Sequence, residues 1–305
     1  MSSNDILPPP RLAPAVPAAG TGQPPMRRPL LALARPRHWI KNGFVFAPLV
    51  FTGMFLDGDA VARTLFAFVL FCAAASATYV FNDLGDLETD RLHPAKRTTR
   101  PLAAGAVTPR QARMLMMALL ACVAAGVALN PAVGAVVMGY LLLNAAYTLR
   151  LKHVAVVDLF CVAGGFVLRV FAGAVAIGVP LSSWMLITTL CLALYLAAVK
   201  RRQELAGGDG AGRRVLAAYT PALLDRYAEM SGVSAVVFYS LFTITVRPEL
   251  SITIPFVLFG LFRYGYVVEC RAGGESPTDL LWKDLPLAGT VVLWVSACVY
   301  ALWPR

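Results

Sequence analysis

The sequence predicts an all-α polytopic membrane protein. Of its 305 residues, 58% are hydrophobic and only 14% are charged, whereas a soluble domain is about half apolar and about a quarter charged. The mean hydropathy is +0.66. The apolar residues also gather in runs near the ~20 residues that an α-helix needs to cross a bilayer.

The segment before the first run is expected to be a tail. Residues 1–34 are rich in proline and alanine and lack an apolar core, so they predict a flexible cytoplasmic tail rather than a signal peptide. Basic residues beside the interfacial Trp39 then mark where the chain reaches the membrane. Residues 35–305 are expected to form a single transmembrane domain.

About nine apolar segments are expected to cross the membrane, although several are short or contain glycine and proline. The connections on one side are short turns, and those on the other side are longer and polar. The expected spans are 40–56, 60–82, 109–129, 131–149, 154–178, 181–199, 229–246, 250–269 and 284–303.

The positive charges indicate how these spans are oriented. With the N-terminus in the cytoplasm, 23 of the 27 lysines and arginines fall on cytoplasmic segments, as in the positive-inside rule. We therefore expect a multi-pass protein of the cell (inner or plasma) membrane, surrounded by membrane lipids. This distribution accounts for the net charge of +10 without a nucleic-acid partner. The six cysteines have no CxxC spacing and predict buried apolar positions.

The end of the second span carries an acidic motif, which here means Asn82, Asp83, Asp86 and Asp90. On a continuous helix the aspartates recur at i, i+3 and i+7 and share one face. Three carboxylates on one face repel each other unless a cation lies between them, and oxygen ligands suit Mg²⁺, which also takes substrate phosphates. The alternative is a solvated helix end at the membrane surface.

Basic residues follow the acidic motif directly, at Lys96, Arg97 and Arg100. Carboxylates, Mg²⁺ and guanidinium groups together are typical of a site for a diphosphate leaving group, which the metal neutralises and the basic side chains clamp. Positive-inside topology alone is the alternative explanation for these cations.

The fourth and fifth spans contribute further polar residues. Tyr147 and Lys152 close the fourth span, and Asp158 begins the fifth. Arg169 follows Asp158 by close to three full turns, so both project from one face. An ionisable residue within a span is a functional candidate, the alternative being a structural ion pair.

The sixth span ends in the basic run Lys200, Arg201 and Arg202. Such a run marks topology or a lipid headgroup site, or else it closes the mouth of an active site and holds an anionic substrate. The glycine-rich stretch at 207–212 is a candidate lid.

The spacing of the acidic motif resembles the first aspartate-rich motif of the UbiA superfamily of intramembrane prenyltransferases, which have a nine-helix fold and an active site on the cytoplasmic side. Residues 35–42, 90–105, 151–158 and 200–205 resemble one branch of that superfamily. Enzymes of this branch join 5-phosphoribosyl diphosphate to decaprenyl phosphate and release diphosphate, in the supply of cell-wall arabinan precursors. The resemblance covers about residues 35–285.

This resemblance implies a phosphoribosyltransferase acting on phosphoribosyl diphosphate and a polyprenyl phosphate. It implies Mg²⁺ on the acidic motif and a catalytic role for Asp83, Asp86, Asp90 and Asp158. The polyprenyl headgroup is expected near Asp158 or the basic run. The implied substrate-binding residues are Lys41, Asn82, Lys96, Arg97, Arg100, Tyr147, Lys152, Arg169, Lys200 and Arg201.

One position departs from the superfamily pattern. Many members carry two aspartates four residues apart, but here Val162 follows Asp158 at that spacing. This weakens the case for a second protein-held Mg²⁺. It also weakens the alternative function, transfer from a prenyl diphosphate to an aromatic or quinone-precursor acceptor. A transporter is a further alternative, although transporter sites lie near the bilayer midplane. The acceptor chain length and the oligomeric state, a homo-oligomer included, stay open.

Overall fold

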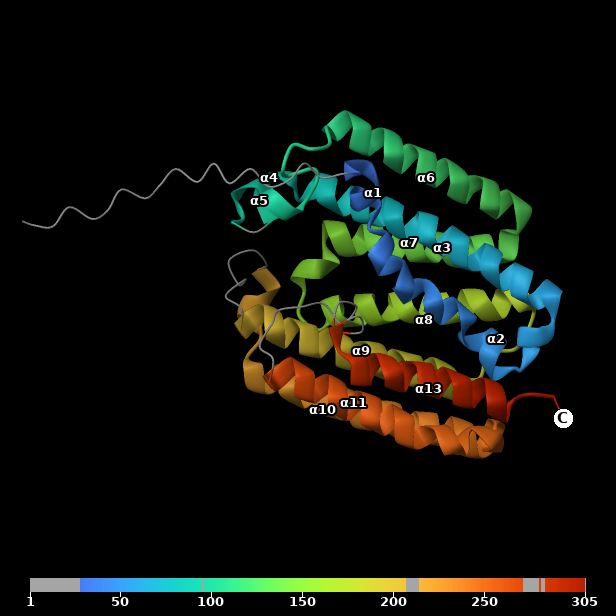
Figure 1. Ribbon diagram of the computed structural model, residues 1–305. Coiled ribbons are helices and arrows are strands. Elements are labelled where there is room, and N and C mark those ends of the chain that lie inside the picture. Colours follow the sequence, from blue (N-terminus) through green and yellow to red (C-terminus); the bar gives the residue numbers. More distant parts are fainter. Residues whose placement is uncertain (1–27, 95, 207–213, 271–279, 281–282, 305) are drawn as a thin grey trace, which may run out of the picture.

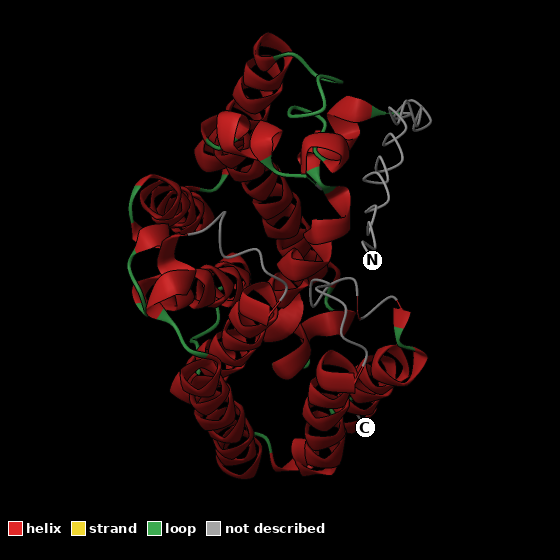
Figure 2. Ribbon diagram, turned by 90° about the vertical axis from the view of Figure 1, so that its left-hand side faces the viewer, coloured by secondary structure: helices red, strands yellow, loops and turns green. Residues whose placement is uncertain are grey.

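The computed structural model describes residues 28–94, 96–206, 214–270, 280 and 283–304, and helices make up nearly all of this part (Figure 1). Figure 2 shows no strand among the described residues. The helices are α1 Pro29–Ala34, η1 Pro36–Phe46, α2 Ala47–Phe51, η2 Met54–Leu56, α3 Gly58–Gly85, α4 Leu87–Leu92, α5 Lys96–Thr99, α6 Pro109–Leu129, α7 Pro131–Leu149, η3 Leu151–His153, α8 Val157–Ile177, α9 Ser183–Ala206, η5 Arg214–Ala218, α10 Pro221–Val246, η6 Pro248–Thr253, α11 Ile254–Cys270 and α13 Leu285–Ala301.

The described chain has seven helical segments that are long and apolar enough to cross a membrane, so it is a multi-pass membrane protein. They are α3, α6, α7, α8, α9, α10 and the continuous path of η6 and α11. Helix α13, over the predicted span 284–303, is shorter, with 17 residues. Helix α10 begins at Pro221, before the predicted start at residue 229.

The first predicted span, 40–56, is a broken path rather than one α-helix. It consists of the 3₁₀ helix η1, the short helix α2 and the 3₁₀ helix η2. Pro48 has no N–H to donate to a preceding carbonyl, which favours a new helix start at this point. Gly53 has a φ of 76°, a left-handed conformation that glycine adopts without steric cost, and it ends α2.

The last part of the predicted flexible tail is helical. Residues 29–34 form helix α1. Leu33 of this helix is completely buried, in a cluster with Val80 of α3, Ala112 of α6 and Leu102 of the connection before α6. Burial of a leucine fixes this helix on the bundle, so the prediction of a flexible tail is wrong for this segment. Residues 1–27 of the predicted tail lie outside the described residues.

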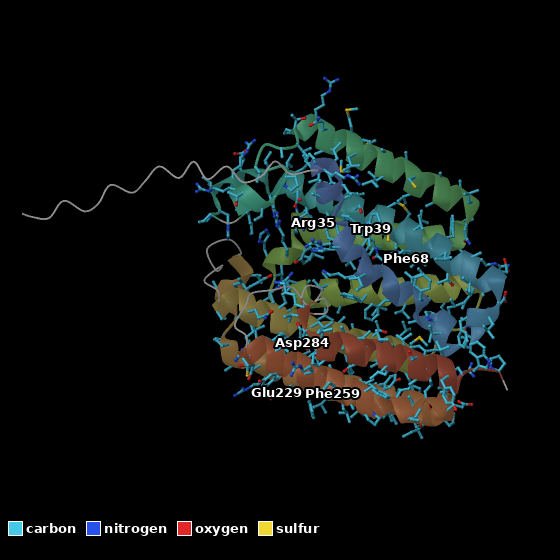
Figure 3. The ribbon with its side chains drawn as sticks, in the orientation of Figure 1. Arg35, Trp39, Phe68, Glu229, Phe259 and Asp284 are labelled. Carbon is cyan, nitrogen blue, oxygen red and sulfur yellow. The ribbon has the colours of Figure 1, made fainter. Side chains whose placement is uncertain are left out.

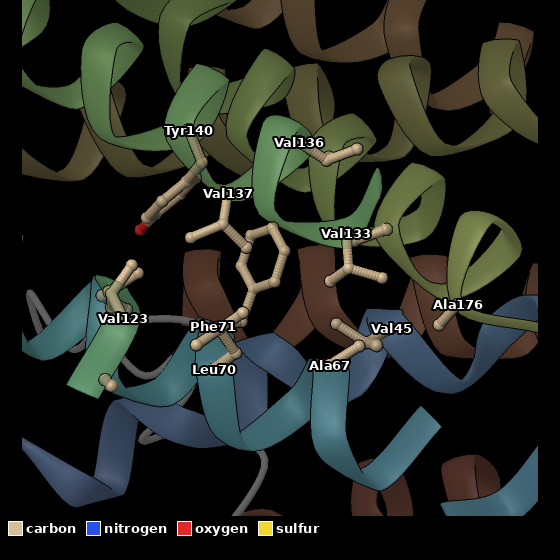
Figure 4. Packing of buried hydrophobic residues seen from close by; sticks show 14 residues of the cluster. Val45, Ala67, Leu70, Phe71, Val123, Val133, Val136, Val137, Tyr140 and Ala176 are labelled. Carbon is tan, nitrogen blue, oxygen red and sulfur yellow. The ribbon is translucent and has the colours of Figure 1, made fainter. Parts of the chain in front are cut away.

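The largest core cluster lies where α3, α6, α7, α8 and η1 meet (Figure 4). Phe71 of α3 packs there among valines of α7 and beside Tyr140. The closest approach is at Gly173 of α8, where an added Cβ would lie 2.0 Å from the carbonyl oxygen of Val45. This contact holds η1 against α8, so residues of the two helices can form one site.

The two ends of the bundle differ. The connections α3–α6 and α7–α8 lie at the left end in Figure 1, together with the C-terminal end of α9 and the N-terminal end of α10. The tight turns that join α6 to α7 and α8 to α9 lie at the opposite end. The acidic motif is therefore at the end with the longer, polar connections.

Candidate active site

The acidic motif bridges two helices. Helix α3 ends at Gly85, Asp86 forms a single turn residue, and α4 begins at Leu87. The N–H of Asp86 donates to the carbonyl of Asn82 at 2.9 Å, and the N–H of Asp90 donates to the carbonyl of Asp86 at 2.8 Å. The helical path is therefore nearly continuous, which keeps the aspartates in the predicted relative positions.

Two aspartates of the motif share one arginine. Arg100 donates from Nη1 to Asp83 at 3.1 Å and from the same atom to Asp90. Arg35 donates to Asp83 at 2.6 Å, and Lys96 Nζ lies 3.9 Å from Asp90. Burial raises the pKa of Asp90, while the positive charges of Arg100 and Lys96 act in the opposite direction. Lys96 and Arg100, both predicted to bind substrate, therefore lie beside the acidic motif.

The third aspartate meets a cation from a distant segment. Asp86 accepts hydrogen bonds from Asn82 at 3.0 Å and from Lys152 of η3 at 2.8 Å. The structure thus brings the α7–α8 connection onto the motif, as expected for a site built from both. Arg97, in contrast, lies on α5 with an exposed side chain.

The chemistry of the motif suits a hard divalent cation. Its four side chains supply carboxylate and amide oxygens, and Asp83 Oδ2 is buried with no hydrogen-bond partner in the described part of the chain. No group of three acidic, histidine or cysteine side chains converges as metal ligands among the described residues. Here the cationic side chains lie between the carboxylates, where they offset the repulsion that a metal ion would also offset.

A second buried cluster surrounds Asp158. Its Oδ2 accepts from Arg201 Nε at 2.8 Å, and its Oδ1 accepts from the Tyr219 hydroxyl at 2.6 Å. Arg201 also donates to Glu204 at 2.9 Å and to the Tyr147 hydroxyl at 3.1 Å. Asp158 and Arg201 are 0% and 3% exposed, so each charge depends on these partners.

Tyr219 was not predicted as a site residue. It lies 61 positions from Asp158, between η5 and α10, where no sequence spacing signals the contact. Its hydroxyl also accepts from the N–H of Val156 at 2.6 Å. Burial, together with the hydrogen bond to Asp158, raises the pKa of this hydroxyl, which therefore stays protonated and donates. Val156 has a φ of 68°, a costly conformation for a β-branched residue.

The cations of the basic run are already paired with carboxylates. Lys200 Nζ lies 3.9 Å from Glu204, and Arg202 pairs with Asp225 and lies 3.7 Å from Glu269. An anionic headgroup at the run would have to compete with these carboxylates. The glycine-rich stretch predicted as a lid lies outside the described residues.

Arg169 and Asp158 do not pair, although they were expected on one face of α8. Arg169 donates to Asn42 at 2.7 Å, to the carbonyl of Gly165 at 2.8 Å and to the Tyr140 hydroxyl at 3.1 Å. Together with Lys41 and Tyr147, Arg169 lines a cavity of about 110 Å³, whose wall includes Val162.

Arg35 makes a further contact with the acidic motif, at Asp83, that no spacing argument predicted. It follows α1 with a φ of 53°, and its guanidinium lies 5.2 Å from the ring centre of Tyr79. Figure 3 shows Arg35 nearer than Trp39 to the end of the bundle that carries α4 and α5. The sequence indicated only that this segment is basic and resembles one branch of a known superfamily.

The chain is similar over most of its length to proteins of a known family. Residues 46–276 match the UbiA prenyltransferase family. The decaprenyl-phosphate phosphoribosyltransferase of Mycolicibacterium smegmatis is 34% identical over 297 residues, which cover 90% of this chain and 92% of that protein. The protein of the same name from Corynebacterium glutamicum is 32% identical over 294 residues, covering 90% of this chain and 86% of that protein.

Solved structures show the same fold. A UbiA homologue from Archaeoglobus fulgidus bound to GPP and Mg²⁺ has a TM-score of 0.70 at 21% identity, covering 90% of this chain and 99% of that one. The family match spans most of the chain, and the relatives align over nearly all of it. The chain therefore belongs to the UbiA prenyltransferase family.

Proposed function

We propose that this protein transfers the 5-phosphoribosyl group of phosphoribosyl diphosphate to a polyprenyl phosphate and releases diphosphate. The observation that carries the proposal is the alignment, over 90% of the chain, with proteins named decaprenyl-phosphate phosphoribosyltransferase. The cations around the acidic motif support it, because a donor with a diphosphate needs such contacts. The product would supply lipid-linked pentose for cell-wall arabinan synthesis.

The acidic motif is the proposed site for the diphosphate of the donor. Asn82, Asp83, Asp86 and Asp90 would hold Mg²⁺, which when bound supplies positive charge to the leaving diphosphate. Arg100 and Lys152 contact the motif and can donate charge-assisted hydrogen bonds to phosphate oxygens.

The same cations favour bond breaking. As the bond between C1 of the ribose and the diphosphate oxygen breaks, negative charge grows on the leaving group. Arg100 and Lys152 then interact more strongly with the transition state than with the intact donor, which lowers the barrier. The acceptor is already a phosphate anion and attacks C1 without a strong general base. The Asp158 cluster positions Tyr147 at the cavity.

The proposed orientation places this chemistry on the cytoplasmic side, where soluble phosphorylated sugars occur. Residues 35–305, extended by α1, would form one catalytic domain, with the polyprenyl tail lying among apolar helices or in the lipid. The membrane is proposed to be the cell membrane.

The deciding experiment uses the full chain in proteoliposomes with phosphoribosyl diphosphate radiolabelled in the ribose. We expect label to enter the lipid fraction, with release of diphosphate, only when decaprenyl phosphate and Mg²⁺ are both present. Transfer seen only from a labelled prenyl diphosphate to an aromatic acid would instead establish the alternative function. No transfer with either pair would reject both.

Two variants of neighbouring acidic residues sharpen the assignment to the motif. Asp86→Ala should abolish diphosphate release while the protein still elutes as a folded species. Glu88→Ala is the matched control, because Glu88 is exposed and pairs only with the exposed Arg91 in the described part of the chain. Retained activity in Asp86→Ala would remove Asp86 from the site.

A further inference from the structure

Arg169 is a charged residue buried inside a membrane span. It is 4% exposed and lies on α8, with Ile177 still eight residues further along the helix. Its described partners are the neutral groups of Asn42, Gly165 and Tyr140, and no carboxylate among the described residues pairs with it. A buried charge without a counter-ion is costly, so such residues are found where they serve a ligand or a transport path.

Aromatic rings surround the guanidinium and compensate only part of this cost. The ring centres of Tyr140, Phe166 and Phe71 lie 4.8, 5.3 and 5.9 Å from it. Two of these side chains are seen in Figure 4. An arginine has five N–H donors, and the three hydrogen bonds use one each on Nε, Nη1 and Nη2. Two donors and the net charge remain for a ligand.

The cavity beside Arg169 has the composition of an anion site. Lys41 supplies a second cation to its wall, and Tyr79 and Asn144 supply polar groups. No acidic residue belongs to the described lining. Gly165 lies directly beside the guanidinium, since an added Cβ there would be in van der Waals contact with Arg169 Nη1 at 3.4 Å.

The size of the cavity limits what it can hold. Its volume of about 110 Å³ is well below the ~300 Å³ at which pockets begin to enclose a whole small molecule. One phosphate group fits this volume, whereas a complete sugar diphosphate does not.

Measured along α3, Arg169 lies deeper than the acidic motif. Asn42, which binds Arg169, donates to Cys72 Sγ at 3.2 Å. Cys72 precedes Asp83 by 11 residues, or about 16 Å along a helix that rises 1.5 Å per residue. Tyr79, which also lines the cavity, precedes Asp83 by only four residues, or about 6 Å, so the cavity extends from the level of Arg169 toward the motif. A phosphate held at Arg169 is therefore a different group from the diphosphate that the motif is proposed to bind, although both groups can belong to one donor.

We propose that Lys41 and Arg169 bind a phosphate monoester, which is carried by one of the two substrates. This inference rests on the proposed function, in which both substrates bear such a group: the 5-phosphate of the donor and the phosphate of the lipid acceptor. Two cations in the wall of one cavity match the charge of a phosphate monoester and leave the acidic motif free for Mg²⁺ and diphosphate.

A binding measurement tests this site without turnover. Thermal unfolding of the purified full chain is followed with ribose 5-phosphate, geranyl phosphate, or diphosphate with Mg²⁺. We expect at least one monoester to raise the Tm of the unsubstituted protein. Lys41→Met and Arg169→Gln should lose that rise and keep the response to diphosphate. Arg113→Met, which removes an exposed cation of α6, should keep both responses.

Kinetics then identify the source of the phosphate. A rise of about tenfold or more in the KM for phosphoribosyl diphosphate in Lys41→Met, with the acceptor KM unchanged, would assign the cavity to the donor. The reverse pattern would assign it to the lipid. Arg169→Lys, which keeps the charge, should show a smaller change than Arg169→Gln.

The outcomes separate this inference from the proposed function. If Lys41→Met and Arg169→Gln keep both monoester responses and both KM values, the cavity is not the phosphate site even though the enzyme transfers phosphoribosyl groups. If a monoester response disappears in the variants but no transfer occurs, the site stands and the proposed reaction fails. If Lys41→Met loses the rise in Tm with the monoesters and the rise with diphosphate together, the proposal of a distinct monoester site would also be overturned.

Discussion

At the scale of single residues, the acidic motif shows how basic side chains can offset the repulsion among neighbouring carboxylates. Spacing alone predicted that three carboxylates lie close together and need a cation. In the structure, Arg35, Arg100 and Lys152 supply that charge. The repulsion among these three carboxylates can therefore be lowered in two ways, by basic side chains or by a divalent ion. The contribution of each can be measured.

Replacing Arg100 tests this balance. Arg100→Gln leaves Asp83 and Asp90, both nearly fully buried, without the guanidinium that bridges them. We expect a loss of about 2 kcal/mol in the free energy of unfolding without metal. Because the carboxylates are less neutralised, Mg²⁺ should raise the Tm of the variant more than that of the unsubstituted protein.

The control for this substitution is Arg91→Gln, whose exposed pair with Glu88 should contribute less than about 1 kcal/mol. Thermal unfolding in detergent, with and without Mg²⁺, measures both variants. An equal rise in Tm for Arg100→Gln and the unsubstituted protein would show that the metal does not act on these carboxylates.

The site could be predicted only where residues are close in sequence or follow a recognisable motif. The acidic motif, Arg100 and Lys152 belong to that group. The contact of Tyr219 with Asp158 spans 61 positions, and that of Arg169 with Asn42 spans 127. Such partners are set by how helices pack against each other, and helical periodicity says which face is apolar but not which helix covers it.

At the scale of secondary-structure elements, the contact between η1 and α8 positions one side of the cavity. Gly173 permits this contact, since a Cβ there would lie 2.0 Å from the carbonyl oxygen of Val45 and 3.2 Å from Pro48 Cδ. A backbone carbonyl cannot move aside as the end of a flexible side chain can. The separation of the two helices is therefore fixed at this position.

Substitution of this glycine should move η1 away from α8. We expect Gly173→Ala to cost about 3 kcal/mol in the free energy of unfolding, because the overlap forces backbone shifts. Gly139→Ala on α7 is the matched control: nothing lies within 4 Å of its added Cβ, and alanine favours a helix by up to about 1 kcal/mol. Tm values of the two variants compare them, and equal stability would contradict the close contact.

The α7–α8 connection is fixed in a different way, through Tyr219. Tyr219→Phe keeps the packed ring but removes the hydroxyl that joins the N–H of Val156 to Asp158. We expect a loss of about 2 kcal/mol, because a backbone donor and a buried carboxylate oxygen lose their partner. Tyr300→Phe, at a side chain that is 72% exposed, should change stability by less than about 0.5 kcal/mol. Chemical or thermal unfolding that shows no difference between the two would exclude the hydroxyl as a structural link.

The helices themselves were largely predictable, because long apolar runs identify spans by composition. Two segments differed for local reasons. Residues 40–56 are apolar enough to span, but Pro48 and Gly53 divide them into short helices. Residues 29–34 are short and follow a proline-rich stretch, yet Leu33 finds a buried position on α3 and α6 that no local pattern signals.

At the scale of the whole molecule, the positive charges and the acidic motif gather at one end of the bundle. The α3–α6 and α7–α8 connections and the C-terminal end of α9 lie at the same end as the motif, and they carry Arg100, Lys152 and Arg201. The turn after α10, which carries Arg247, lies at the opposite end. A field of one sign at the mouth of a site raises the local concentration of an oppositely charged substrate. The orientation of the protein in the membrane and the capture of an anionic substrate thus require the same charge distribution. Both depend on which side of the membrane this end of the bundle faces.

Orientation is tested by thiol labelling of intact cells with a membrane-impermeant maleimide. In a background with all six cysteines replaced, Glu88→Cys at the motif end should be protected until the cells are opened, because positively charged ends remain in the cytoplasm. Glu249→Cys, exposed in the η6 segment at the other end, should be labelled at once. The reverse pattern would place the site outside the cell and away from any cytoplasmic sugar diphosphate. Labelling of both positions in intact cells would mean that Glu88 is reachable from outside, which the positive-inside argument does not allow.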